Sequence, residues 1–240
     1  MRLILLCCWL RSYLRMGCND MQTIMDSIPI REVLHFLGWR GTPIEPELVI
    51  RINRMIETVR SQIQPYVAVQ RFCIEPTGCL QGTCFLPQGS DIHAMLASCD
   101  EAVLLAATLG VQSERMLLKE QARNKADALL LDAVLSAAIE AVCDREEEAL
   151  RLQCGKSGLY LTDRFSPGYG DMPIAQAKEI CEVLQTGKTI GLTVSQSGIM
   201  IPRKSVTAMM GISRVRPKRR SSGCAVCAMR DSCPMAKIDD

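Results

Sequence analysis

The pattern of hydrophobic and polar positions predicts three helical segments in the first two thirds of the chain. The clearest covers residues 46–63, because Pro46 suits the first helical turn and apolar residues then recur every three or four positions. A short helix is expected within 28–38, and a long helical segment within 113–153, with a break near Asn124. The apolar face of the 46–63 helix consists of Leu48, Ile52, Met55, Ile56, Val59 and Ile63.

Two apolar runs indicate strands. Residues 66–69 are rich in residues that favour β-structure. Periodicity alone does not separate a buried strand from a buried helix in 102–107, and we favour a strand there. The intervening residues 75–91 are rich in Gly, Pro, Thr and Cys and are expected to form a loop or an irregular hairpin. Because helices and strands do not alternate regularly, we predict a single α+β domain with helices packed on a curved, mainly antiparallel β-sheet.

Residues 164–171, Arg-Phe-Ser-Pro-Gly-Tyr-Gly-Asp, are the most informative segment for function. They combine a permanent cation, a Pro-Gly turn and an aromatic hydroxyl in one short loop. The planar guanidinium matches a carboxylate or a phosphate, and glycine lets the backbone approach a ligand closely. An ordinary surface turn remains the alternative interpretation.

A helix and a hairpin are predicted after this loop. Asp171 and Pro173 suit the start of a helix, and Gly187 suits its C-terminal cap. Apolar residues then alternate with polar ones over 190–194, and 199–201 returns as a second strand after a turn. A hairpin of this kind favours antiparallel pairing.

Composition indicates a globular chain of 240 residues, with 48% hydrophobic and 22% charged residues. The net charge of +2 is uneven, because residues 213–240 hold seven Lys/Arg against three Asp/Glu and the remainder carries −2. The body is therefore not expected to bind polyanions, and the basic tail is more typical of a solvated segment than of a nucleic-acid contact. We expect no nucleic-acid partner, also because aromatic residues make up only 4% of the chain.

The thirteen cysteines are odd in number and mostly lie in apolar contexts, which suits reduced thiols in the cytoplasm. The apolar run 3–10 is too short to span a bilayer, so no membrane association is expected. We expect residues 1–25 to be an extension, with the working protein beginning near Met16, Met21 or Met25.

The tail contains a separate candidate site. Cys224, Cys227 and Cys233 have a spacing that could hold zinc or an iron–sulfur cluster. A closed site usually needs four ligands, and Cys79, Cys84 or a second chain could supply another. An alternative function is therefore a thiol-based metal or redox-responsive binding protein.

The order of several motifs resembles the activation domain of cobalamin-dependent methionine synthase, in a free-standing form. The resemblance covers about residues 26–212, which leaves 213–240 as a basic, Cys-containing tail. The downstream motifs are Arg164-x3-Gly168-Tyr169, Leu192-Thr193-x-Ser195-x-Ser197-x2-Met200-x-Pro202 and Ser205-Val206. The upstream motifs are Asp91-Ile92, Cys99, the run from Ala102 to Gly110, and Asp132-Ala133 leading to Glu140.

This resemblance implies a site for S-adenosylmethionine. Arg164 would pair with the ligand carboxylate, and the backbone around Ser166 and Gly168 would read the adenine edge. Tyr169 would donate a hydrogen bond or place its ring beside the sulfonium. Glu140 matches the helix glutamate of the family and would face a ligand cation.

Three positions depart from the family. Met210 stands where the family has an aromatic residue, so only its backbone is carried over to the ligand site. Gln196 replaces the usual acid of the hairpin. Asp26 is the nearest residue to an aspartate that the family has in its N-terminal segment.

The function that the resemblance implies is support for reductive methylation of cob(II)alamin on a methionine synthase acting in trans. The partners would be a cobalamin-binding synthase without its own activation domain and a flavodoxin- or ferredoxin-like electron donor. The chain would then be a non-autonomous component of a methyltransferase system, with no catalytic residue of its own. An independent methyltransferase would show a glycine-rich loop after an early strand, and a radical enzyme would need Cys-x3-Cys-x2-Cys; the sequence has neither.

Overall fold

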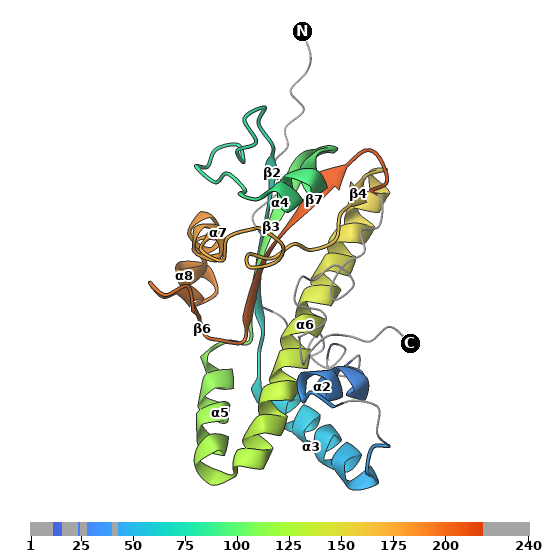
Figure 1. Cartoon of the computed structure of the whole chain (residues 1–240), viewed down its shortest axis with the longest axis vertical. Helices are drawn as coiled ribbons and strands as arrows, with labels where there is room; N and C mark the ends of the chain where they lie inside the picture. The colour runs from blue at the N-terminus through green and yellow to red at the C-terminus, as the bar shows by residue number, and fades with distance from the viewer. Residues whose placement is uncertain (1–11, 16–23, 25–27, 40–42, 218–240) are drawn as a thin grey trace.

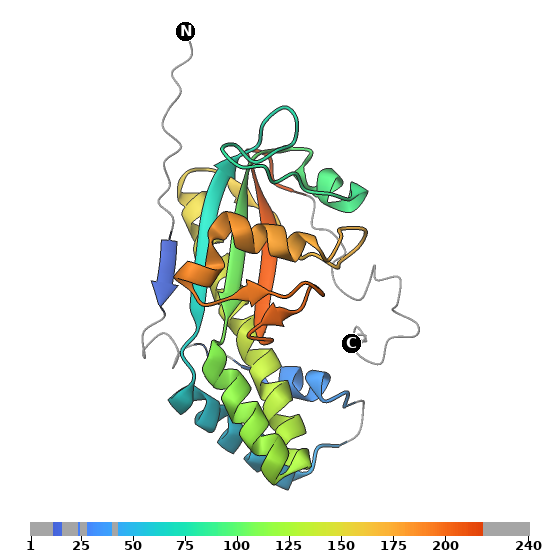
Figure 2. The same cartoon turned by 90° about the vertical axis from the view of Figure 1, so that its left-hand side faces the viewer.

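A five-stranded antiparallel sheet forms the centre of the molecule, with helices on both of its faces (Figures 1 and 2). The computed structural model describes residues 12–15, 24, 28–39 and 43–217. Neighbouring strands follow the order β1-β2-β3-β7-β4, and each pair is antiparallel. The strands are β1 (Ser12–Arg15), β2 (Tyr66–Cys73), β3 (Cys99–Thr108), β7 (Ser205–Ser213) and β4 (Tyr160–Leu161).

Two hydrophobic clusters hold the layers together, one on each face of the sheet. The first cluster joins the sheet to α2 (Ile30–Phe36), α3 (Pro46–Gln62), α5 (Val111–Arg123) and α6 (Lys125–Lys156). The second joins it to α4 (Ser90–Leu96) and α7 (Gln176–Leu184), which continues into α8 (Thr186–Thr189). The predicted α+β fold with an antiparallel sheet is confirmed.

The continuous apolar run in β3 is explained by burial on both faces. Val103 and Leu105 belong to the cluster under α6, and Leu104 and Ala106 belong to the cluster under α7. A strand covered on both sides has no polar face, so it lacks the alternation that identifies most antiparallel strands. The strand predicted for 102–107 is confirmed within the longer β3.

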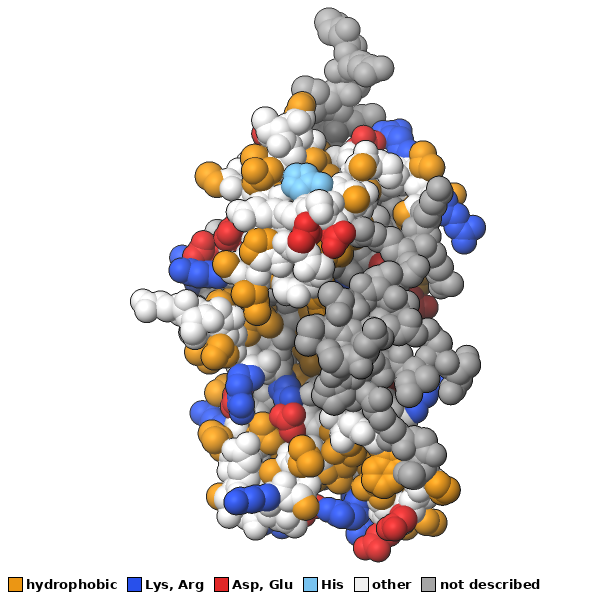
Figure 3. Space-filling model, in the orientation of Figure 1, with side chains coloured by type: hydrophobic (Ala, Val, Ile, Leu, Met, Phe, Trp, Pro, Cys, Tyr) orange, Lys and Arg blue, Asp and Glu red, His pale blue; other side chains and the backbone are white. Residues whose placement is uncertain are grey.

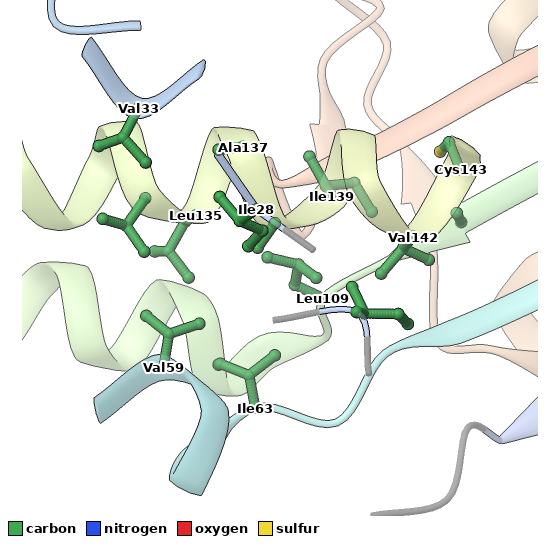
Figure 4. Packing of buried hydrophobic residues seen from close by; sticks show 14 of the residues in the cluster. Ile28, Val33, Val59, Ile63, Leu109, Leu135, Ala137, Ile139, Val142 and Cys143 are labelled. Atoms are coloured by element: carbon green, nitrogen blue, oxygen red, sulfur yellow. The ribbon is translucent and has the colours of Figure 1, made fainter. Parts of the chain in front are cut away.

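Helix α6 runs along the length of the molecule and supplies much of the first core (Figure 1). Asn124 has an extended backbone, and its side chain accepts hydrogen bonds from the amides of Ala126 and Asp127, so α5 ends and α6 begins there. The predicted break is confirmed. Figure 4 shows side chains of α6, among them Leu135 and Val142, in the cluster that also contains Val59, Ile63 and Leu109.

The segment after the 164–171 loop differs from its prediction. The helix ends at Leu184, because Gln185 takes a left-handed conformation with φ of 53°, and Gly187 lies inside α8 instead of capping α7. The predicted hairpin is shorter, with β5 (Thr193–Val194) pairing with β6 (Met200–Ile201) as a separate two-stranded sheet. Leu192 is instead held by Thr186, whose hydroxyl donates to the Leu192 carbonyl at 2.6 Å.

Both ends of the folded unit extend slightly beyond 26–212. Strand β1 lies in the range expected to be an extension, and it pairs with β2 from Ser12↔Val69 onward. Ser213 closes β7, where it pairs with Tyr160 and its hydroxyl donates to the Ser98 carbonyl at 2.7 Å. None of the described helices combines the length with the continuous apolar character that a membrane span requires. On the face shown in Figure 3, the charged side chains of described residues are mixed in sign.

Candidate functional site

The segment that leads into the 164–171 loop is fixed along the edge of β7. Thr162 donates its amide to the Gly211 carbonyl at 2.9 Å, and its hydroxyl accepts from the Gly211 amide at 2.8 Å. Phe165 exchanges two backbone hydrogen bonds with Met209, at 2.9 and 2.8 Å. Arg164 lies between these two attachments, so the sheet determines where its side chain starts.

The Arg164 side chain reaches α6, where it contacts three carboxylates. Its Nη2 lies 3.4 Å from Glu140 and also bonds Asp144, and its Nε donates to Glu147 at 2.9 Å. Asp144 and Glu147 follow Glu140 by four and seven residues, which places the three acids on one face of the helix. The structure therefore brings together two of the predicted site residues, Arg164 and Glu140.

The cluster formed by Arg164, Glu140, Asp144 and Glu147 carries one positive and three negative groups, a formal charge of −2. Burial lowers the pKa of Arg164. The neighbouring Cys143 sulfur and the three carboxylates raise this pKa by more than burial lowers it, so the net shift is upward. The guanidinium is thus permanently charged. Below it, Cys143 is fully buried, and this burial raises the pKa of its thiol to about 12.

The Pro-Gly turn of the loop is closed by its own backbone. Gly168 has a φ of +94° and donates its amide to the Met172 carbonyl at 2.9 Å, and Tyr169 donates to the Ser166 carbonyl at 3.1 Å. A positive φ of this size suits glycine. The Tyr169 side chain is 64% exposed, so its ring is presented at the surface of the turn.

Asp171 fixes the far end of the loop to α4, a role that the sequence did not reveal. Its carboxylate accepts from the amide and the hydroxyl of Ser90, both at 2.6 Å, and from the Asp91 amide at 3.0 Å. A Cβ at Gly170 would collide with the Asp91 carboxylate, so glycine is needed next to this attachment. The Ser90 hydroxyl, followed by the two amides, lowers the pKa of Asp171 to about 2.

We predict that this attachment gives acid-dependent stability. Since the pKa in the folded state is lowered, Asp171 contributes stability that is present above its ordinary value of 3.8 and is lost as the pH falls through about 2. D171N should therefore be less stable than the wild type at neutral pH, and this difference should shrink on acidification. Urea unfolding of both proteins at pH values from about 6 to about 2 measures it. A difference that stays constant over this range would contradict the assignment.

Met210 lies in the hydrophobic core, and Gln196 lies at the surface. Met210 is fully buried in the cluster beneath α6 and stands opposite Val103 in the β3–β7 register. Because Met209 and Gly211 direct their backbone groups to the 162–165 segment, the intervening Met210 directs its own toward β3. Gln196 is exposed at the turn between β5 and β6. Asp26 lies outside the described residues.

Glu140, Asp144 and Glu147 belong to a polar stripe on one face of α6. This stripe continues in both directions along the helix, which the sequence analysis missed. Lys204, just before β7, places its Nζ 2.8 Å from Asp132 and 2.7 Å from Ser136. At the other end, Arg151 donates to the Leu161 carbonyl at 2.7 Å. A regular four-residue spacing of polar side chains from Asp132 onward is the signal that could have shown this stripe. A shallow depression on it is lined by Asp144, Glu147, Glu148 and Arg151.

The predicted metal ligands Cys224, Cys227 and Cys233 lie outside the described residues. Among the residues that the structure does describe, no group of three or more His, Cys, Asp and Glu side chains is arranged to hold a metal ion. Cys84 is exposed and Cys79 is half-buried. Burial raises the thiol pKa at four other positions: Cys99, Cys143, Cys154 and Cys181.

Comparison with known proteins places this arrangement in a fold class. No protein-family model matches the sequence, and a search of curated proteins finds no match. The fold is an α+β domain of the methionine synthase activation type. It is similar to the crystal structure of the MetH reactivation domain bound to AdoHcy, with a TM-score of 0.64 and 15% sequence identity over 88% of this chain and 80% of that chain. The fold that the sequence motifs implied is confirmed.

Proposed function

We propose that this protein binds S-adenosylmethionine and supports reductive methylation of cob(II)alamin on a cobalamin-dependent methionine synthase acting in trans. The observation that carries the proposal is the pairing of Arg164 with Glu140 at the edge of a fold shared with the MetH reactivation domain. That solved domain is bound to AdoHcy, the demethylated form of the proposed ligand.

The charges of the cluster suit the amino-acid end of S-adenosylmethionine. A guanidinium pairs with a carboxylate through directional hydrogen bonds, and the helix carboxylates can pair with the ligand ammonium. The ligand carries a sulfonium and an ammonium against one carboxylate, so its net charge is +1. Glu140 and Glu147 together outweigh the single positive charge of Arg164, so the cluster attracts such a ligand. The Tyr169 ring is exposed on the same loop as Arg164, and its face would contact the sulfonium.

The contribution of the chain is to position the ligand. The sulfonium supplies a methyl group on a good leaving group, so the transfer needs no general base. The cluster of Arg164 with the α6 carboxylates would fix the amino-acid end, and the 166–169 turn would lie beside the rest of the ligand. Holding two reactants in a productive geometry makes their reaction effectively intramolecular. The cobalamin belongs to the partner synthase, and a flavodoxin- or ferredoxin-like protein would supply the single electron that the reduction requires.

The test is reconstitution. A methionine synthase that lacks its activation domain and holds cob(II)alamin should regain activity only when this protein, S-adenosylmethionine and the electron donor are all present. Calorimetric titration of the purified protein with S-adenosylmethionine and with AdoHcy should first show binding. If the protein binds neither ligand, the proposal is rejected, because the fold would then serve a function without S-adenosylmethionine.

Removing residues 218–240 separates this function from the thiol-based alternative. The truncation leaves β7 and Ser213 intact, so ligand binding and reactivation should persist. The described buried thiols give the alternative no support, because a raised pKa keeps them protonated and poorly nucleophilic at neutral pH. Loss of S-adenosylmethionine binding on truncation would instead assign the site to the tail.

A further inference from the structure

We infer that Asp144 substitutes for the ligand carboxylate on Arg164 in the ligand-free protein and must leave when S-adenosylmethionine binds. This inference rests on the proposed function. It makes Asp144 a residue that lowers affinity for the ligand, in contrast to its neighbours on the same helix face. An internal competitor of this kind keeps Nη2 of the half-buried guanidinium paired with an anion in both states.

The bonds of Arg164 show that one of its nitrogens is shared. Nη2 contacts both Glu140 and Asp144, whereas Nε is bound by Glu147 alone. A bidentate carboxylate normally occupies two nitrogens of the guanidinium with both of its oxygens. Here Nε is bound by one side chain and Nη2 by two others. A ligand carboxylate can therefore bind Nη2 while Glu147 stays on Nε.

Burial decides which of the carboxylates can leave. The side chain of Asp144 is 69% exposed, that of Glu140 is 47% exposed, and that of Glu147 is only 18% exposed. An exposed ion pair contributes little because water solvates the separated charges well. When a buried carboxylate loses its partner, water cannot solvate the separated charges in the same way. Asp144 is therefore the partner that detaches most readily, and Glu147 is the one that remains and orients Arg164.

The exchange has a consequence for ligand specificity. A ligand with a carboxylate displaces Asp144 and replaces its bond to Nη2. A ligand without a carboxylate leaves Asp144 in place on Arg164, and it meets a cluster whose charge is unchanged. The effect of Asp144 should therefore depend on whether the ligand has a carboxylate, whereas a general electrostatic effect of this acid would act on both kinds of ligand.

The experiment compares two variants and two ligands by calorimetric titration of the full chain. D144N should bind S-adenosylmethionine about two- to fivefold more tightly, as expected for release of an exposed ion pair. The same variant should bind decarboxylated S-adenosylmethionine no more tightly than the wild type does. E147Q is the matched control on the same helix face, and it should weaken binding of S-adenosylmethionine, because Arg164 loses the partner that orients it.

The outcomes separate this inference from the proposed function. If D144N weakens binding of S-adenosylmethionine, Asp144 is a direct ligand contact and the inference is wrong. Equal tightening of both ligands would also overturn it, since displacement by the carboxylate would then play no part. If the wild type binds neither S-adenosylmethionine nor AdoHcy, the proposed function itself fails. Thermal unfolding of each variant confirms that the comparison is made on folded protein.

Discussion

Lysine in place of Arg164 (R164K) is expected to weaken S-adenosylmethionine binding by about 10- to 100-fold, because hydrogen bonds between charged groups contribute about 1.5–3 kcal/mol. Lysine keeps the charge but lacks the planar fork that can hold Glu147 on Nε and a ligand carboxylate on Nη2 at the same time. It also offers only one nitrogen to the three carboxylates that Arg164 now holds. Calorimetric titration of both proteins with S-adenosylmethionine measures the loss.

Two comparisons make this prediction specific. R123K changes an exposed arginine that pairs with Glu120 on α5, and it should leave the affinity unchanged. Decarboxylated S-adenosylmethionine should bind R164K and the wild type with similar affinity, because it lacks the carboxylate that we propose Arg164 binds. An R164K protein that binds S-adenosylmethionine within twofold of the wild type would remove Arg164 from the ligand site.

The helices and the central strand could be predicted because their signals are local. The 46–63 helix shows its apolar face directly, and Asn124 marks the boundary between α5 and α6 through a cap that bonds residues two and three positions later. The resemblance to the activation domain then supplied the arrangement, which the structural comparison confirms. Strand β7 was not predicted as an element, although Val206, Ala208, Met210 and Ile212 alternate with Ser, Thr, Met and Gly residues. The strand is buried on both faces, with Met210 and Ile212 in the cluster under α6 and Met209 in the cluster under α7.

The candidate site could be predicted only in part. The sequence identified Arg164 and Glu140 separately, 24 positions apart, and the resemblance gave each a role. It gave no sign that Asp144 and Glu147 share the same guanidinium, because their acidic neighbours make a solvated helix face equally plausible. The bond from Ser90 to Asp171 spans 81 positions, and only the folded chain brings these residues together. Contacts of this range depend on how the loop crosses the sheet, which no local pattern encodes.

Alanine in place of Gly211 (G211A) should destabilise the protein by about 1–3 kcal/mol, the usual cost of overpacking a core. A Cβ at this position of β7 would lie 2.5 Å from the Cys99 sulfur and 3.0 Å from the Leu96 side chain. Backbone shifts that relieve the contact would disturb the two hydrogen bonds between Gly211 and Thr162, which hold the segment before Arg164. We therefore expect weaker ligand binding as well as a lower midpoint of urea unfolding.

A second glycine tests whether the effect is steric. Gly155 lies in α6, and a Cβ added there would meet nothing within 4 Å, so G155A should stabilise the protein by about 0.5–1 kcal/mol through helix propensity. Adding C99A to G211A removes the sulfur and should recover part of the lost stability, with a coupling of at least about 0.5 kcal/mol between contacting sites. If G211A were as stable as the wild type, or if C99A gave no recovery, β7 would have to pack against Cys99 more loosely than the structure shows.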